Sequence, residues 1–257
     1  MKLNLIIKKT SYLNLLVIVA LFTIPITVFP TQALAQINIP NWSYSGDTNP
    51  NQWGKISSEF SLCEVGKNQS PINIENVQER KSIDLDFNYR PTPLSITDTG
   101  YNVQVNYQPG NKIKINNHEY ELLQFHFHTP SEHTINSQPS VMEIHLLHRN
   151  SQGELAVLGV MIEPGKSNSL IDDIILYQVG KNEYATINAA DLLPNNKNYF
   201  SYNGSLTTPP CSENVKWIIF VEPIQASKNQ ILAVQALYET NARPVQPRND
   251  RIIQLHR

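Results

Sequence analysis

The 257-residue sequence has little charge and only two cysteines. Charged residues make up 16% of the chain and the formal net charge is −2, so the sequence indicates no basic surface for nucleic acid or for an anionic membrane. It contains no internal repeat and no low-complexity linker after residue 35, which favours a single domain. The hydrophobic fraction of 40% is ordinary for a globular core.

The one long apolar run lies at the N-terminus. Three lysines precede the run over residues 13–29, and an Ala-x-Ala sequence from Ala33 to Ala35 follows it. This order is typical of a secretory signal, so we expect a signal peptide over 1–35 and a mature domain over 36–257, in the periplasm or outside the cell. A retained membrane anchor is the alternative, because the run is long for a signal. After cleavage we expect no membrane segment.

The two cysteines are Cys63 and Cys211. In an exported protein an even pair predicts a disulfide bond. Two buried free thiols are the alternative.

Short segments with alternating polarity dominate the mature chain. Val103 and Val105, a turn over 108–111, and Ile113 with Ile115 predict a hairpin. Further strands are expected over residues 122–128, 141–148, 155–162 and 216–221.

Helices are few. Ser169 with Asp172, and Ser227 with Gln230, have the spacing of capping boxes before apolar residues at helical spacing. We therefore predict an α+β, mostly β fold: a single domain around a large, mainly antiparallel twisted sheet with a few short peripheral helices.

One segment carries three functional side chains on one face. In a strand, alternate residues point the same way, so Gln124, His126 and His128 share a face while Phe125 and Phe127 share the other. On its own, a His-x-His pair more often marks a polar sheet face than a metal site.

A second segment repeats the pattern. Glu143 and His145 share a face, and Ile144 and Leu146 line the opposite one. If the two strands pair, three imidazoles converge beside Gln124 and Glu143, whose oxygens would orient the rings. Three histidines leave a tetrahedral zinc one open position for water, which favours a catalytic zinc site; copper is possible on affinity grounds.

Six motifs in compatible order are similar to those of the α-class carbonic anhydrases, over about residues 42–251. They are Gln69-Ser70-Pro71-Ile72-Asn73-Ile74, Gln124-Phe125-His126-Phe127-His128, Ser131-Glu132-His133, Glu143-Ile144-His145-Leu146-Leu147-His148, Ser205-Leu206-Thr207-Thr208-Pro209-Pro210 and Arg243-Pro244-Val245-Gln246-Pro247.

The resemblance implies a zinc enzyme that reversibly hydrates carbon dioxide to bicarbonate and a proton. His126, His128 and His145 match the zinc ligands, with Gln124 and Glu143 behind them. A hydroxide on the zinc attacks carbon dioxide in this family, oriented by the pair that Thr207 and Glu132 match. Tyr44 and Tyr202 match tyrosines that organise water and the network around Glu132. The residues matching the substrate pocket are Leu147, Val157, Leu206, Thr208, Val215 and Trp217.

The chain departs from the family's fast members at Tyr101, which follows Gly100 where they carry a proton-relaying histidine. Phenols ionise near pH 10, so a tyrosine relays protons poorly at neutral pH. We therefore expect proton transfer to limit turnover.

Two other functions fit parts of the sequence. A non-catalytic carbonic-anhydrase-like binding module would share the fold, although such relatives usually lose a zinc histidine. A cupin-like oxygenase also uses three histidines, but it would not explain residues 205–210. Related bacterial enzymes are often dimers, so a homodimer is possible.

Overall fold

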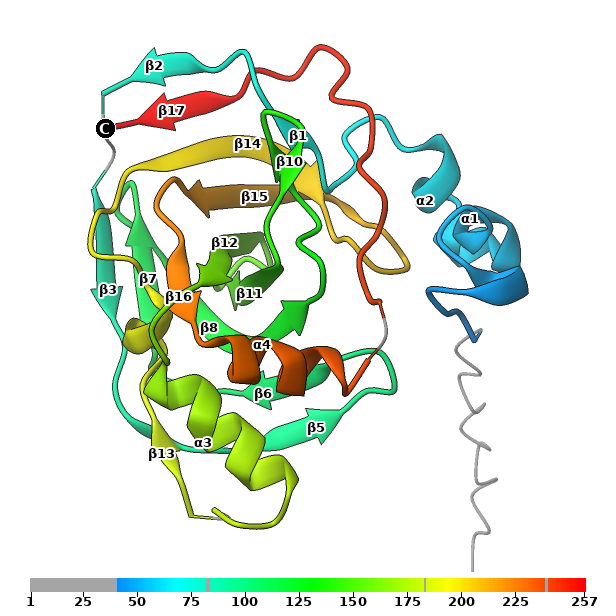
Figure 1. The fold of residues 1–257 in the computed structure, drawn as a ribbon. Coiled ribbons are helices and arrows are strands. Elements are labelled where there is room, and N and C mark those ends of the chain that lie inside the picture. The colour runs from blue at the N-terminus through cyan, green and yellow to red at the C-terminus, as the bar shows by residue number, and fades with distance from the viewer. Residues whose placement is uncertain (1–40, 82–83, 183, 239) are drawn as a thin grey trace, which may run out of the picture. The chain divides into compact units, whose positions relative to one another are not determined.

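The computed structural model describes residues 41–81, 84–182, 184–238 and 240–257 (Figure 1). The expected signal peptide over 1–35 lies outside the described residues. Within the described part, no helix has the length and apolar character needed to cross a membrane.

Strands make up most of the regular structure. They are β1 (Asn73–Ile74), β2 (Gln78–Arg80), β3 (Leu85–Asn88), β4 (Thr92–Pro93), β5 (Ile96–Asp98), β6 (Val103–Asn106), β7 (Lys112–Ile115), β8 (His118–His128), β9 (Thr134–Ile135), β10 (Gln138–Pro139), β11 (Met142–Arg149), β12 (Leu155–Pro164), β13 (Thr186–Ile187), β14 (Tyr199–Ser205), β15 (Glu213–Phe220), β16 (Ile224–Ala226) and β17 (Gln254–His256).

Twelve of these strands form one sheet in the described part of the chain. Its main path runs β2-β17-β14-β15-β12-β11-β8-β6-β5, with β16 on β12, β7 on β8 and β3 on β7. Only the pairs β12–β15, β12–β16 and β17–β2 are parallel. The sheet confirms the predicted mainly antiparallel, mostly β architecture.

The helices are short. They are α1 (Trp53–Ile56), α2 (Leu62–Val65), α3 (Ser169–Gln178) and α4 (Lys228–Gln235), with 3-10 turns at Gly46–Thr48, Ser58–Phe60 and Ala189–Leu192. The capping box at Ser227 and Gln230 is confirmed at the start of α4. The capping box predicted at Ser169 and Asp172 is wrong. The N-cap of α3 is Asn168, whose side chain accepts the N–H groups of Leu170 and Ile171.

The hairpin predicted between Val103 and Ile115 is also wrong. Strands β6 and β7 do not pair with each other; both pair with β8, at different points along its length. The hairpin that forms joins β7 to β8 through Asn116 and Asn117, whose φ angles are 49° and 66°. Asparagine tolerates this left-handed region, which the tight turns between antiparallel strands require.

The two histidine-bearing strands divide their faces as predicted. Phe125, Phe127, Ile144 and Leu146 are buried in the main hydrophobic core. That packing leaves the histidines on the opposite face of the sheet.

The predicted disulfide bond is present. Cys63 at α2 and Cys211 in the loop before β15 are joined with an S–S distance of 2.07 Å. Both are buried against Trp53 and Phe60. The bridge therefore ties the helical N-terminal part of the described chain to the loop that follows Thr207.

Replacing both cysteines, with Cys63→Ser and Cys211→Ser, should lower the free energy of unfolding. The bridge spans 148 residues, and closing a loop of that length stabilises a fold by about 5 kcal/mol on the chain-entropy model. Guanidinium denaturation of the variant and of the unmodified chain, with and without reductant, measures the difference. Equal unfolding midpoints in all four samples would show that the bridge does not stabilise the fold.

Candidate metal centre

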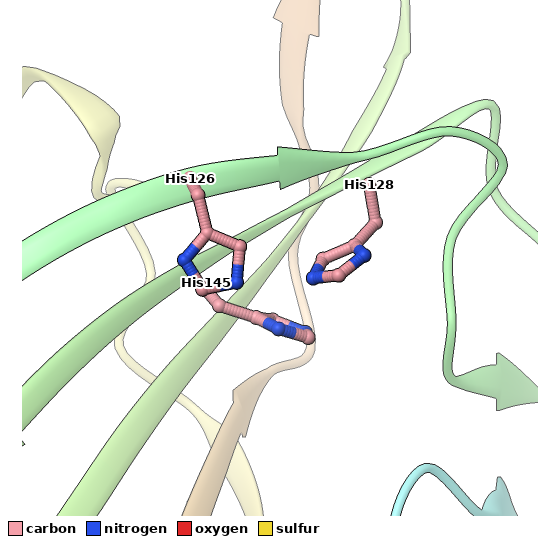
Figure 2. A group of neighbouring side chains, drawn as sticks. All are labelled: His126, His128 and His145. Carbon is pink, nitrogen blue, oxygen red and sulfur yellow. The ribbon is translucent and has the colours of Figure 1, made fainter. Parts of the chain in front are cut away.

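The pairing of β8 with β11 brings the three histidines together. In this antiparallel register His126 lies opposite His145, and His128 lies opposite Glu143. Figure 2 shows His126 and His128 projecting from one strand and His145 from its neighbour, with the rings turned toward a common point. One candidate ligand nitrogen from each ring lies within 4.8 Å of the other two.

Two of the rings are oriented by the partners that the sequence predicted. His126 Nδ1 lies 2.8 Å from Gln124 Oε1, so Nδ1 carries the hydrogen and Nε2 is left free. His145 Nε2 lies 2.8 Å from Glu143 Oε1, which leaves Nδ1 free. An oxygen acceptor on one ring nitrogen fixes the tautomer and frees the other nitrogen for a metal.

The third ring has a partner that the sequence analysis missed. His128 Nδ1 donates to the backbone carbonyl of Asn241, 2.6 Å away. Its Nε2 is buried and has no hydrogen-bond partner among the described residues. An unpaired buried nitrogen is costly, and a metal ion at the common point would satisfy it.

The protonation of the rings also suits a metal. Burial lowers the pKa of His128 to about 4, and it lowers those of His126 and His145 too. The rings are therefore neutral at pH 7, as metal ligands must be. The donor set, three neutral imidazoles, suits zinc.

Glu143 is a buried carboxylate that orients the neighbouring backbone and histidine side chains. Its two oxygens accept four N–H groups: the backbone amides of Glu132 and His133, His133 Nδ1 and His145 Nε2, at 2.7–2.9 Å. Burial alone would raise the pKa of Glu143, but the neighbouring histidines and these hydrogen bonds outweigh it and hold the pKa well below its ordinary value. The carboxylate is therefore ionised.

Glu132 is 2% exposed, and its carboxylate oxygens lie 3.6 Å from His128 Nδ1 and 3.8 Å from His145 Nδ1. Its Oε1 accepts the backbone N–H of Arg243 at 2.8 Å, a contact the sequence analysis also missed. Burial raises the pKa of Glu132 to about 7, while His145, the Arg243 N–H and the Thr207 hydroxyl limit the rise. Its Oε2 is buried and has no hydrogen-bond partner among the residues that the structure describes.

A cavity of about 140 Å³ opens beside two of the rings. It is lined by Gln124, His126, His145, Leu147, Val157, Leu206, Thr207, Thr208 and Trp217. The structure thus brings five of the six predicted pocket residues to the cavity. Val215 is the exception: it is buried in the cluster around Val157 and Trp217 and does not line the opening.

The three tyrosines singled out from the sequence differ in their surroundings. Tyr202 donates to His133 Nε2 at 2.6 Å and contacts Ser70 Oγ at 2.8 Å. The buried hydroxyl of Tyr44 has no hydrogen-bond partner among the described residues. Tyr101 stacks on Trp42, with 3.8 Å between ring centroids, and its hydroxyl donates to Asn41 Oδ1 at 3.1 Å.

The family model of the eukaryotic-type carbonic anhydrases matches residues 48–257. The chain belongs to this family, the α-class carbonic anhydrases. It is therefore an enzyme of the carbonic anhydrase class, and the resemblance seen in six motifs is confirmed. Neither the fold nor the family fits a cupin-like oxygenase.

Relatives of known sequence and solved structures support the same family. A carbonic anhydrase from Nostoc sp. is 42% identical over 85% of this chain and 87% of its own length. A hyperthermostable carbonic anhydrase from a hydrothermal vent chimney is 41% identical, with a TM-score of 0.78, over 84% of this chain and all of its own. The α-carbonic anhydrase of Thermovibrio ammonificans, solved with the inhibitor sulfanilamide, is 36% identical with a TM-score of 0.78, over 84% of this chain and 99% of its own.

Metal analysis tests the centre directly. We expect about one zinc ion per chain in the purified protein and almost none in the His145→Ala variant, because two imidazoles hold zinc far more weakly than three. The exposed His118 is the matched control, and His118→Ala should retain the metal. Equal zinc content in the two variants would disprove the assignment of the ligands.

Proposed function

We propose that this chain is a zinc-dependent enzyme that interconverts carbon dioxide and bicarbonate. The observation that carries the proposal is the set of three neutral imidazoles, each with one nitrogen free, beside a small cavity with an apolar wall. His126 and His128 would hold the zinc through Nε2 and His145 through Nδ1. When bound, zinc supplies hydroxide at neutral pH by lowering the pKa of water to about 7.

Thr207 and Glu132 would orient the nucleophile. When Glu132 is ionised, its carboxylate only accepts hydrogen bonds, so the Thr207 hydroxyl must donate to it. The threonine oxygen is then left as an acceptor for the hydrogen of the attacking group, which turns a lone pair toward the substrate. The N–H of Arg243, 2.8 Å from Glu132 Oε1, holds the carboxylate in place for this task. Such positioning lowers the barrier without further chemistry.

The cavity wall would hold the substrate. Leu147, Val157 and Trp217 present apolar surface next to His145. Carbon dioxide is linear and uncharged, so a dry pocket of the right size is sufficient to bind it. Val215 would support this wall from behind.

The three retained histidines weigh against a non-catalytic binding module. We also propose that the chain is exported, to the periplasm or outside the cell. The buried disulfide bond fits an oxidising compartment, and the sequence pattern over residues 1–35 is that of a signal. The homodimer stays a prediction.

Stopped-flow hydration of carbon dioxide tests the role of Thr207. We expect Thr207→Ala to lower kcat/KM by roughly 10²-fold while zinc content is unchanged, because the nucleophile loses its orienting acceptor. Thr207→Ser keeps the hydroxyl and should recover most of the rate. An alanine variant as fast as the unmodified chain would exclude this role, and an inactive unmodified chain with full zinc would support the binding module instead.

The buffer dependence of the rate tests the departure at Tyr101. We expect hydration in dilute buffer to be limited by proton transfer and to rise several-fold with added imidazole, since imidazole accepts protons near pH 7. Tyr101→His should be faster in dilute buffer and less sensitive to imidazole. Tyr101→Phe should behave like the unmodified chain. Fast turnover that does not depend on buffer concentration would show that another group relays the proton.

A further inference from the structure

A second cavity lies on the face of β15 opposite the metal centre. Trp217 faces the metal side, whereas its neighbours Lys216 and Ile218 line this cavity of about 230 Å³. Ser201 of β14 also lines it. The side chains of this cavity are not among those assigned to the carbonic anhydrase reaction, apart from Tyr202 at its border.

Ser201 is hydrogen-bonded to His256, which is buried and does not itself line the cavity. Ser201 Oγ lies 2.9 Å from Nε2 of His256, on the adjacent strand β17. On the far side of the ring, Nδ1 lies 3.3 Å from the backbone carbonyl of Lys81. A carbonyl only accepts, so Nδ1 carries the hydrogen, Nε2 is the acceptor, and Ser201 donates to it.

The imidazole is rigid and neutral. Its ring stacks on Tyr199, with centroids 4.4 Å apart and planes inclined by 15°. Burial lowers the pKa of His256 below its ordinary value, so the ring is uncharged and able to take a proton at pH 7. A nucleophile, a base within hydrogen-bond reach and a third group that orients the base are the features that define nucleophilic catalysis by serine.

The cavity offers a place for an acyl group. Ile115, Ile218 and Ile252 give it apolar walls, and Ile218 is directly opposite Ser201 on the neighbouring strand. Lys216 also lines the cavity, with its ammonium 3.3 Å from the Tyr120 hydroxyl to which it donates. The apolar walls beside Ser201 suit a short apolar acyl group.

We propose that Ser201 and His256 form a second, metal-independent catalytic site that hydrolyses esters with short apolar acyl groups. Ser201 Oγ attacks the carbonyl carbon and its proton passes to His256 Nε2. The bond to the leaving alcohol then breaks, and the alcohol departs with that proton. Water attacks the acyl-serine, gives a proton to Nε2 and releases the carboxylic acid, which restores Ser201.

Ester hydrolysis by the His145→Ala variant isolates this site from a zinc-dependent background. We expect this variant to hydrolyse p-nitrophenyl acetate, and Ser201→Ala added to it to lower that rate at least tenfold. His256→Gln should do the same, since glutamine can accept the serine hydrogen bond but cannot take the proton. Ser151, exposed in a turn, is the matched control, and Ser151→Ala should change nothing.

Labelling of the unmodified full-length chain gives an independent readout that does not need a variant to fold. A serine-reactive fluorophosphonate should modify Ser201, as located by peptide mass spectrometry. No adduct at Ser201, or a rate that survives Ser201→Ala, would overturn the proposal and show the Ser201–His256 pair to be structural. Neither result depends on carbon dioxide hydration, so this site and the metal centre succeed or fail separately.

Discussion

The register between β8 and β11 is the constraint on which the metal centre depends. His126 lies opposite His145, so both rings stand on one face while Phe125, Phe127 and Ile144 fill the core behind them. A slip of one residue in β11 would turn His145 into the core and expose its apolar neighbours. Burying each large apolar side chain is worth roughly 1.5–3 kcal/mol. Core packing therefore enforces the geometry of the three histidines.

Glu143 extends that constraint from the sheet to the loop carrying Thr207. His133 donates Nδ1–H to Glu143, so its Nε2 accepts from Tyr202. Tyr202 then accepts from Ser70 Oγ, which in turn accepts the Ser205 N–H at 3.1 Å. Each donor in this buried chain of hydrogen bonds has one acceptor, and all of the bonds point along the chain toward Glu143. Loss of one member would leave a buried polar group unpaired, which costs free energy, so the network holds its members in one conformation.

The sequence was sufficient to predict the histidine faces, their Gln124 and Glu143 partners, the disulfide bond and one helix cap, because strand alternation and local motifs determine them. The missed features depend on tertiary contacts. The partner of His128 is a backbone carbonyl 113 residues away, and any residue type could supply it. Strands β6 and β7 both pair with β8, at different points along its length. A turn between two segments of alternating polarity does not show whether those segments pair with each other or with a third strand.

The topology also implies an order of assembly. The three histidines lie on β8 and β11, which pair in the sheet and are separated along the chain only by the short strands β9 and β10. The cost of closing the loop between them is therefore small. Glu132 receives its Arg243 contact across 111 residues, and β2 pairs with β17 at Gln78 and Gln254. Contacts across such separations form late. The three imidazoles are thus brought together before the Asn241 carbonyl that orients His128 and the Arg243 N–H that holds Glu132 are in place, and the catalysis proposed for this site would be the last property to appear.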